Sequence, residues 1–178
     1  VSFDARYRYY DYNNKTEHFE TTPLIGDWSV GTGLMENEPG SIKRATLDLD
    51  GSVSAHKYLT LNFGFTREDS DRTFRIYEKT DENVFRVSLD SVGSQYVTFR
   101  TKYEHSVREG SHFEEHLLEE VGEHPETRHY DVANRKRDRV TAIVTVTPAS
   151  YFQLNGSVGT GKDTFDETGF GLLENETR

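Results

Sequence analysis

Two histidines that bracket a pair of glutamates have the spacing of a catalytic metal site. The segment His112-Phe-Glu-Glu-His116 matches the pattern H-x-x-E-H, in which two histidines on one helical face bind zinc and a glutamate serves as the base. The surrounding stretch near 111–121 carries the one convincing helical signal, but it is short and acidic. Because a zinc hydrolase also needs a third ligand and short motifs often match by chance, we expect no resident metal and no enzyme.

One basic cluster stands out in an otherwise acidic chain, at residues 134–139. Its cationic side chains could bind the phosphates of lipopolysaccharide through charge-assisted hydrogen bonds. Pairing with nearby acids, such as those at 114–120, is the alternative, and exposed pairs of that kind stabilise a protein little. The lipopolysaccharide candidates are Arg135, Lys136, Arg137 and Arg139.

A third set of polar residues recurs at every second position within runs that are otherwise apolar. In an extended strand such positions share one face, so these side chains would lie together on a wet surface. That surface could line a lumen or bind a partner protein, and pairing of the charges across strands is compatible with both roles. The set comprises Asp48, Asp50, Asn62, Arg86, Asp90, Arg100 and Lys102.

The elements that would position these residues are β-hairpins. In the stretch 44–67, every second residue of two arms is apolar, and the arms meet at the short turn His56-Lys57-Tyr58. This alternation indicates an antiparallel hairpin with one apolar and one polar side. The apolar positions are Ala45, Leu47, Leu49, Val53 and Ala55 in the first arm, and Leu59, Leu61, Phe63 and Phe65 in the second.

The same layout recurs along the chain and predicts about seven strands. The remaining strands are expected at 1–12, 84–91, 95–105, 139–147 and 152–158. Tight turns near residues 57, 93 and 149 would lie on one side, and long loops at 13–41, 68–82 and 106–138 on the other. Residues 161–178 read as a Gly- and Asp-rich loop without a closing strand.

Two folds accommodate such strands. A soluble β-sandwich buries the apolar faces between two sheets, whereas a transmembrane barrel turns them to lipid and its polar faces to a lumen. The arms exceed the usual length of about five to six residues in soluble strands, which favours the barrel. We therefore predict an all-β, antiparallel up-and-down transmembrane barrel, or a segment of one, as a single domain over 1–178 with a short helix near 111–121.

Composition narrows the function further. The 178 residues carry a formal net charge of -10 and no cysteine, which argues against nucleic acid as a partner and excludes disulfides and covalently attached c-type haem. No run approaches the roughly 18 apolar residues of a membrane helix. The chain opens on Val-Ser-Phe-Asp, already strand-like, so we expect a mature product or a fragment without a signal peptide.

Several short segments of the chain carry a family resemblance. One is Arg-Tyr-Arg-Tyr-Tyr-Asp-Tyr-Asn-Asn-Lys-Thr at 6–16. Others follow in order within 122–163: Gly-Glu-His-Pro, Arg-His-Tyr-Asp-Val-Ala-Asn-Arg, Asp-Arg-Val-Thr, Val-Thr-Pro and Gly-Lys-Asp. Together they resemble the MtrB/PioB family of large outer-membrane barrels from porin-cytochrome electron conduits. The likeness spans most of the chain and part of a family-sized barrel, and the amino-terminal cysteine pair of some members is absent.

The resemblance implies a function without a catalytic residue. It implies a barrel in the outer membrane of a Gram-negative bacterium, surrounded by lipid, that is porin-like or serves as the sheath of a multihaem c-type cytochrome in electron transport. Haem would then come only through the partner cytochrome. A soluble β-sandwich that binds glycan or protein is the alternative function.

Overall fold

The computed structural model describes residues 1–17, 19–21, 35–37, 39–73, 75, 77–94, 96–113, 133–165 and 173–177. Every regular element in these ranges is a β-strand, and none of the described residues forms a helix long and apolar enough to cross a membrane. The strands are β1 (Ser2–Tyr12), β2 (Glu20–Thr21), β3 (Met35–Glu36), β4 (Ile42–His56), β5 (Leu59–Arg72), β6 (Tyr77–Ser94), β7 (Val97–Phe113), β8 (Arg135–Ala149), β9 (Phe152–Thr164) and β10 (Glu174–Thr177).

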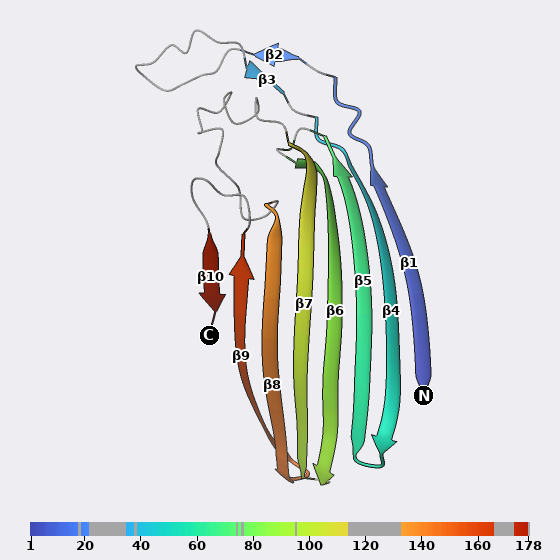
Figure 1. Cartoon of the computed structure of the whole chain (residues 1–178), viewed down its shortest axis with the longest axis vertical. Helices are drawn as coiled ribbons and strands as arrows, with labels where there is room; N and C mark the ends of the chain where they lie inside the picture. The colour runs from blue at the N-terminus through green and yellow to red at the C-terminus, as the bar shows by residue number, and fades with distance from the viewer. Residues whose placement is uncertain are drawn as a thin grey trace.

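Eight of these strands form one antiparallel sheet in the order β1-β4-β5-β6-β7-β8-β9-β10. Each strand pairs with the next along the chain, except that the separate β2-β3 pair lies in the connection between β1 and β4. The sheet is curved, with tight turns at one end and long connections at the other (Figure 1). Strands β1 and β10 are its two edges, so the sheet is up-and-down and not closed.

The three predicted hairpins are confirmed. Two residues, Lys57 and Tyr58, connect β4 to β5, and equally short connections join β6 to β7 and β8 to β9. The pairing register shifts only beside these turns, as between Ser54 and His56, and runs without interruption over the rest of each hairpin. Continuous register preserves the alternation of faces that the sequence pattern requires.

The apolar residues of neighbouring strands lie opposite one another and form one face. Phe63 pairs with Gly51 on β4 and Val87 on β6, and Val87 pairs with Tyr103 on β7. We call this the apolar face, and its members include Phe3, Leu47, Leu61, Phe63, Val87, Phe99, Val144 and Leu154.

The apolar face does not form the core of a sandwich. Its large side chains stay exposed, Phe63 by 44% and Phe85 by 53%. The described part of the chain contains no second large sheet that could pack against them. The soluble β-sandwich is therefore the wrong alternative, since its apolar faces would meet each other.

The opposite side of the same strands is polar. The register places Asp50 beside Gly64, Gly64 beside Arg86, and Arg86 beside Glu104 across four strands. We call this the polar face, and Ile143 on β8 is an apolar residue that shares it. Its members include Asp48, Asp50, Asn62, Arg86, Asp90, Arg100, Lys102 and Thr145.

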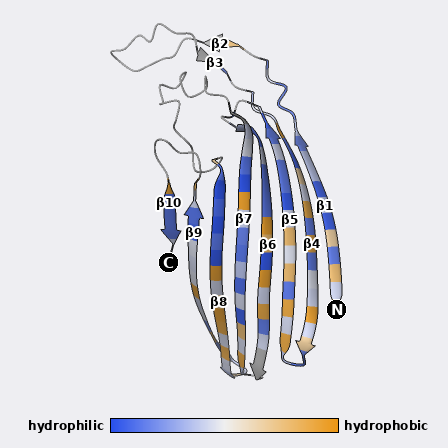
Figure 2. Ribbon diagram, viewed as in Figure 1, coloured by the Kyte–Doolittle hydropathy of each residue, from blue (hydrophilic) through white to orange (hydrophobic). Residues whose placement is uncertain are grey.

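Several strands run further than the alternation predicted. β5 continues to Arg72, β6 begins at Tyr77, and β7 continues to Phe113. Most of the loop predicted at 68–82 is therefore strand, as are both ends of the loop predicted at 106–138. Hydrophobic residues gather toward the tight turns, and the opposite ends of the strands are hydrophilic (Figure 2). We call those ends the loop-proximal half, namely residues 8–12, 42–46, 67–72, 77–83, 106–113, 135–138, 161–164 and 174–177, and the remainder of the sheet the turn-proximal half.

The carboxyl-terminal part departs from the prediction of a structureless end. β9 extends to Thr164, and β10 pairs with it through Glu174 and Thr164, so the sheet has eight strands rather than about seven. Of the helix predicted near 111–121, residues 111–113 belong to β7, and 114–121 lie outside the described residues. The assignment of 1–178 to a single domain stays a prediction.

Candidate functional site

The polar face gathers all seven residues that the sequence singled out as lumen-facing or partner-binding. Asp48 on β4 is held from both neighbouring strands: Arg8 of β1 donates to Oδ2 at 2.8 Å, and the Thr66 hydroxyl of β5 donates to Oδ1 at 2.7 Å. Because both carboxylate oxygens accept hydrogen bonds, this residue links three strands. Neither partner was identified from the sequence.

A second ion pair reaches across β5 at Gly64, where no side chain stands between the two charged groups. Arg86 Nη2 of β6 lies 3.5 Å from Asp50 Oδ1 of β4, with Gly64 of β5 between them. A Cβ at Gly64 would lie 2.5 Å from the Asp50 carboxylate and 3.0 Å from Arg86 Nε. Gly64 therefore provides the space in which this ion pair forms.

The third group centres on Asp90 of β6. Arg100 of β7 donates to both carboxylate oxygens, at 2.5 and 2.9 Å, and the Asn62 amide of β5 donates to Oδ2 at 3.1 Å. The same amide also donates to the Ser88 hydroxyl at 3.0 Å. A two-point contact between guanidinium and carboxylate is the strongest geometry for such a pair.

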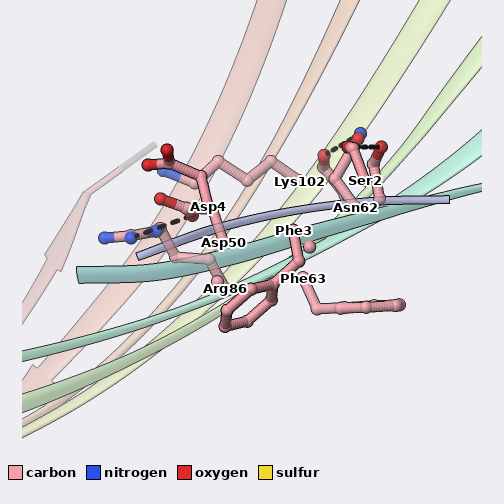
Figure 3. A pocket seen from close by; sticks show the side chains of 12 residues that line it. Ser2, Phe3, Asp4, Asp50, Asn62, Phe63, Arg86 and Lys102 are labelled. Carbon is pink, nitrogen blue, oxygen red and sulfur yellow. Dashed lines mark hydrogen bonds and ion pairs between the residues drawn. The ribbon is translucent and has the colours of Figure 1, made fainter. Parts of the chain in front are cut away.

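A shallow hollow of about 500 Å³ lies over the middle of this region. Lys102 contributes to its lining and forms an ion pair of 2.7 Å with Glu104 on the same strand. Figure 3 shows the rings of Phe3 and Phe63 on one side of the strands and the carboxylates of Asp4 and Asp50 on the other. The hollow is thus an open, charged surface rather than an enclosed substrate cavity.

The basic cluster lies mainly on the polar face. Arg135 forms an ion pair of 2.7 Å with Glu82, and Arg137 contacts Asp163 at 2.6 and 2.7 Å. Arg139 shares this face, whereas Lys136 projects from the opposite one. The proposed contact of the four residues with lipopolysaccharide stays a prediction.

The ion pair between Arg137 and Asp163, which lies in the loop-proximal half, shifts the pKa values of both groups. The hydrogen bonds from Arg137 hold the pKa of Asp163 below its usual value, and partial burial of the carboxylate opposes this effect. Reciprocally, the hydrogen bond to Asp163 raises the pKa of Arg137. Both groups are therefore charged at neutral pH, and the pair contributes to the stability of the fold.

The described residues offer no cluster that could bind a metal ion. No group of three or more histidine, aspartate and glutamate side chains among them could hold a metal ion. The H-x-x-E-H motif cannot be placed, because residues 114–116 lie outside the described residues. Chemically, the described polar face can bind water, ions or a charged protein surface.

Comparison with known proteins identifies one family. The family model described as "putative outer membrane beta-barrel porin, MtrB/PioB" matches residues 1–178, which is the whole chain. No curated protein matches the sequence. The match agrees with the resemblance of the segments at 6–16 and 122–163.

Proposed function

The chain belongs to the MtrB/PioB family of outer membrane β-barrel porins. From this premise we propose that it forms part of a barrel wall around a multihaem c-type cytochrome in transmembrane electron transport. Membership places the protein in the bacterial outer membrane, in contact with lipid. The single observation that supports the sheath role best is the polar face, on which charged side chains pair with one another across strands.

The apolar face has the dimensions and borders of a membrane surface. On β8 its residues run from Val140 to Val146, which spans about 20 Å at ~3.3 Å per residue and is close to the ~25 Å band of outer-membrane barrels. Each tight turn carries an exposed tyrosine, and such rings mark membrane-water boundaries. These are Tyr58, Tyr96 and Tyr151.

The polar face suits a hydrated protein as its occupant. Asp48, Asp50 and Asp90 each have a cationic partner on another strand, so the wall needs no counter-ion from a guest at these positions. Paired, half-exposed charges can face water and a protein surface without the cost of burying an uncompensated charge. A sheath requires this property because its guest must be enclosed without being denatured.

The chemistry of electron transfer belongs to the guest. The 178 residues contain no cysteine, so they cannot attach c-type haem through thioether bonds. We therefore propose that this chain serves as a non-catalytic wall and carries no covalently attached haem of its own. Haem reaches the assembly only through the cytochrome.

Reconstitution tests the proposal. The full-length barrel, purified from native membranes with whatever it retains, is placed in vesicles that contain a redox dye, and a membrane-impermeant reductant is added outside. We expect haem absorbance in the purified barrel and reduction of the enclosed dye.

The contrary result is equally clear. A barrel that purifies without haem and lets small solutes cross the vesicle wall while transferring no electrons is an ordinary porin. In that case the cytochrome sheath is wrong, although family and localisation stand.

A further inference from the structure

A second hollow, of about 340 Å³, lies at the loop end of β1, β4 and β5. Tyr12 ends β1 here, Ile42 begins β4 and Arg72 ends β5 (Figure 1). The register places the three residues side by side, because Ile42 pairs with Tyr12 on one side and Arg72 on the other. We call this hollow the mouth pocket, and its other described lining residues are Gly40, Ser41, Thr73 and Arg75.

The mouth pocket belongs to the polar face of the sheet. Alternation along β4 puts Ile42 on the same face as Asp48. Arg72 Nη1 donates to the Thr80 hydroxyl at 3.1 Å, and Thr80 is a buried residue of this face. Because the long loops of outer-membrane barrels lie outside the cell, the pocket lies at the outer mouth of the lumen.

Three hydrogen bonds fix the frame of the mouth pocket. The Ser41 amide donates to Thr73 Oγ1 at 2.8 Å, and the Thr73 amide donates to the Ser41 carbonyl oxygen at 3.1 Å. The Asn14 amide also donates to Ser41 Oγ, at 3.0 Å. These bonds join the segments that follow β1, precede β4 and follow β5, so the pocket keeps its shape without a ligand.

The charges that line the mouth pocket are of one sign. Arg72 and Arg75 are both basic, and none of the described lining residues is acidic. The hollow over the middle of the sheet differs, since Asp4 and Asp50 line it together with basic residues. In a chain with 31 acidic and 21 basic residues, this local excess of positive charge indicates a site for an anion.

Arg75 supplies an uncommitted cation. Its side chain is exposed at the pocket, and no described residue forms a hydrogen bond or an ion pair with it. Arg72, in contrast, is held by Thr80 and supplies a positive charge that is fixed in place. A guanidinium offers planar N–H donors that match the oxygens of a phosphate group. Arg75 is therefore free to bind an anion that Arg72 already attracts.

The mouth pocket also has an apolar part. Tyr12 and Ile42 contribute an aromatic ring and a branched aliphatic side chain, which can pack against the carbon body of a ligand. The volume of about 340 Å³ lies at the lower end of the range of ~300–1,000 Å³ for organic ligands. A ligand with an anionic head and a small organic body therefore suits the pocket better than a bare ion.

We propose that the mouth pocket binds a small phosphate monoester, with Arg72 and Arg75 at the phosphate and Tyr12 against the organic group. A phosphate monoester carries a charge of about -1.5 to -2 at pH 7, which two guanidinium groups match. The inference goes beyond the sheath function and does not rest on it, because every residue of the site belongs to the wall. It gives the barrel a solute-binding site at its outer mouth.

Direct binding to the full-length barrel tests this site. The barrel is purified in detergent and titrated calorimetrically with phenyl phosphate, inorganic phosphate and phenol. Arg75→Gln removes the uncommitted cation, and Tyr12→Ala removes the ring. The matched control is Lys43→Gln, which removes a positive charge from the residue after Ile42, on the opposite face of β4. The folded fraction of each variant is determined by heat-modifiable electrophoretic mobility.

The expected results assign a role to each part of the pocket. Phenyl phosphate should bind about tenfold more tightly than inorganic phosphate, and phenol should not bind. Arg75→Gln should lower the affinity for both phosphates about tenfold or more. Tyr12→Ala should reduce the affinity for phenyl phosphate to that for inorganic phosphate, and Lys43→Gln should match the wild type.

Three results would overturn the inference. If the wild-type barrel binds neither phosphate, the pocket is not an anion site. If Lys43→Gln loses as much affinity as Arg75→Gln, the attraction comes from the general charge of the loop end rather than from the pocket. If inorganic phosphate binds as tightly as phenyl phosphate, the ligand is not an organic ester. Haem retention plays no part in these titrations, so the sheath function is tested separately.

Discussion

The turn-proximal and loop-proximal halves of the sheet share one hydrogen-bonded ladder but differ in how they are stabilised. In the loop-proximal half, polar residues occupy both faces, and side chains such as Tyr77, Thr80 and Ser106 are buried. In the turn-proximal half, the large apolar side chains stay exposed, among them Phe63, Val87 and Phe99. All seven buried residues of the described part lie in or directly beside the loop-proximal half.

This difference shows which half depends on its surroundings. Exposed apolar rings are unfavourable in water, so the turn-proximal half requires hydrocarbon on one side. The loop-proximal half carries its own packing, as where the Tyr77 ring fills the space above Gly110, and its own ion pairs. The same strands can thus extend beyond the membrane without a change of fold, provided that their apolar side chains give way to polar ones.

The largest expected effect comes from placing the same charge on the apolar face of each half. Phe63→Arg puts a cation in the lipid-facing band and should destabilise the barrel by about 2–4 kcal/mol near the midplane. Asn83→Arg, on the same face in the loop-proximal half, should cost about 0–1 kcal/mol. Unfolding of the full-length barrel in lipid vesicles measures both, and equal costs would contradict a membrane boundary between the halves.

A smaller effect is expected from breaking one two-point ion pair in each half. Asp163→Asn should cost about 2 kcal/mol, because Arg137 would remain mostly buried without its anion. Asp90→Asn should cost less, about 0.5–1 kcal/mol, because the Arg100 side chain is 59% exposed. Urea unfolding of the detergent-solubilised barrel measures both costs. If Asp90→Asn costs more than Asp163→Asn, burial of the ion pair does not distinguish the two halves.

The ion pair between Arg137 and Asp163 also predicts that the stability of the barrel falls at acid pH. Because the folded pKa of Asp163 is lowered, its stabilising contribution is complete above the usual aspartate pKa of about 3.9. The contribution is lost as the pH falls through the lower folded value. Between about pH 6 and about pH 3, the wild type should therefore lose more stability than Asp163→Asn. Equal losses would show that the pair does not titrate as proposed.

The smallest effect is expected at an exposed pair in the loop-proximal half. Arg67 donates to Asp69 at 3.0 Å, and both side chains are about half exposed. Asp69→Ala should leave the free energy of unfolding unchanged within the error of the measurement, because solvent screens an exposed pair of this kind. A clear loss of stability would mean that this face is covered in the full assembly.

The sequence predicted the turn-proximal half well because lipid and water impose strict alternation on it. Arms such as 44–55 and 59–66 were recognisable from period-two apolar residues, and the turns followed from them. The loop-proximal half lacks that signal. Stretches such as Arg67-Glu-Asp-Ser-Asp-Arg72 are polar at every position, so they resemble loop although they are strand. The fully polar β10 was missed for the same reason.

The polar face was predictable as a set of residues but not as a network. Alternation placed Asp48 and Arg86 on one side, whereas their partners depend on strand register, which in a hairpin is fixed by the length and type of the turn. The bridge from Asp50 to Arg86 over Gly64 is one such case. Alternation could also have placed Arg135, Arg137 and Arg139 with Thr141 on the polar face, but the cluster was first interpreted by charge alone.

Labelling of adjacent residues tests the central claim, that one face meets lipid and the other an interior, most directly. This chain has no cysteine, so Phe63→Cys and Asn62→Cys each introduce a unique thiol in it for a spin label. In the full-length barrel in vesicles, we predict that the label at 63 is relaxed by oxygen, which partitions into lipid. The label at 62 should respond instead to a water-soluble nickel complex or become immobile against a guest. If the label at 63 is immobile and shielded from oxygen, the residue packs in a protein core, and the account is wrong.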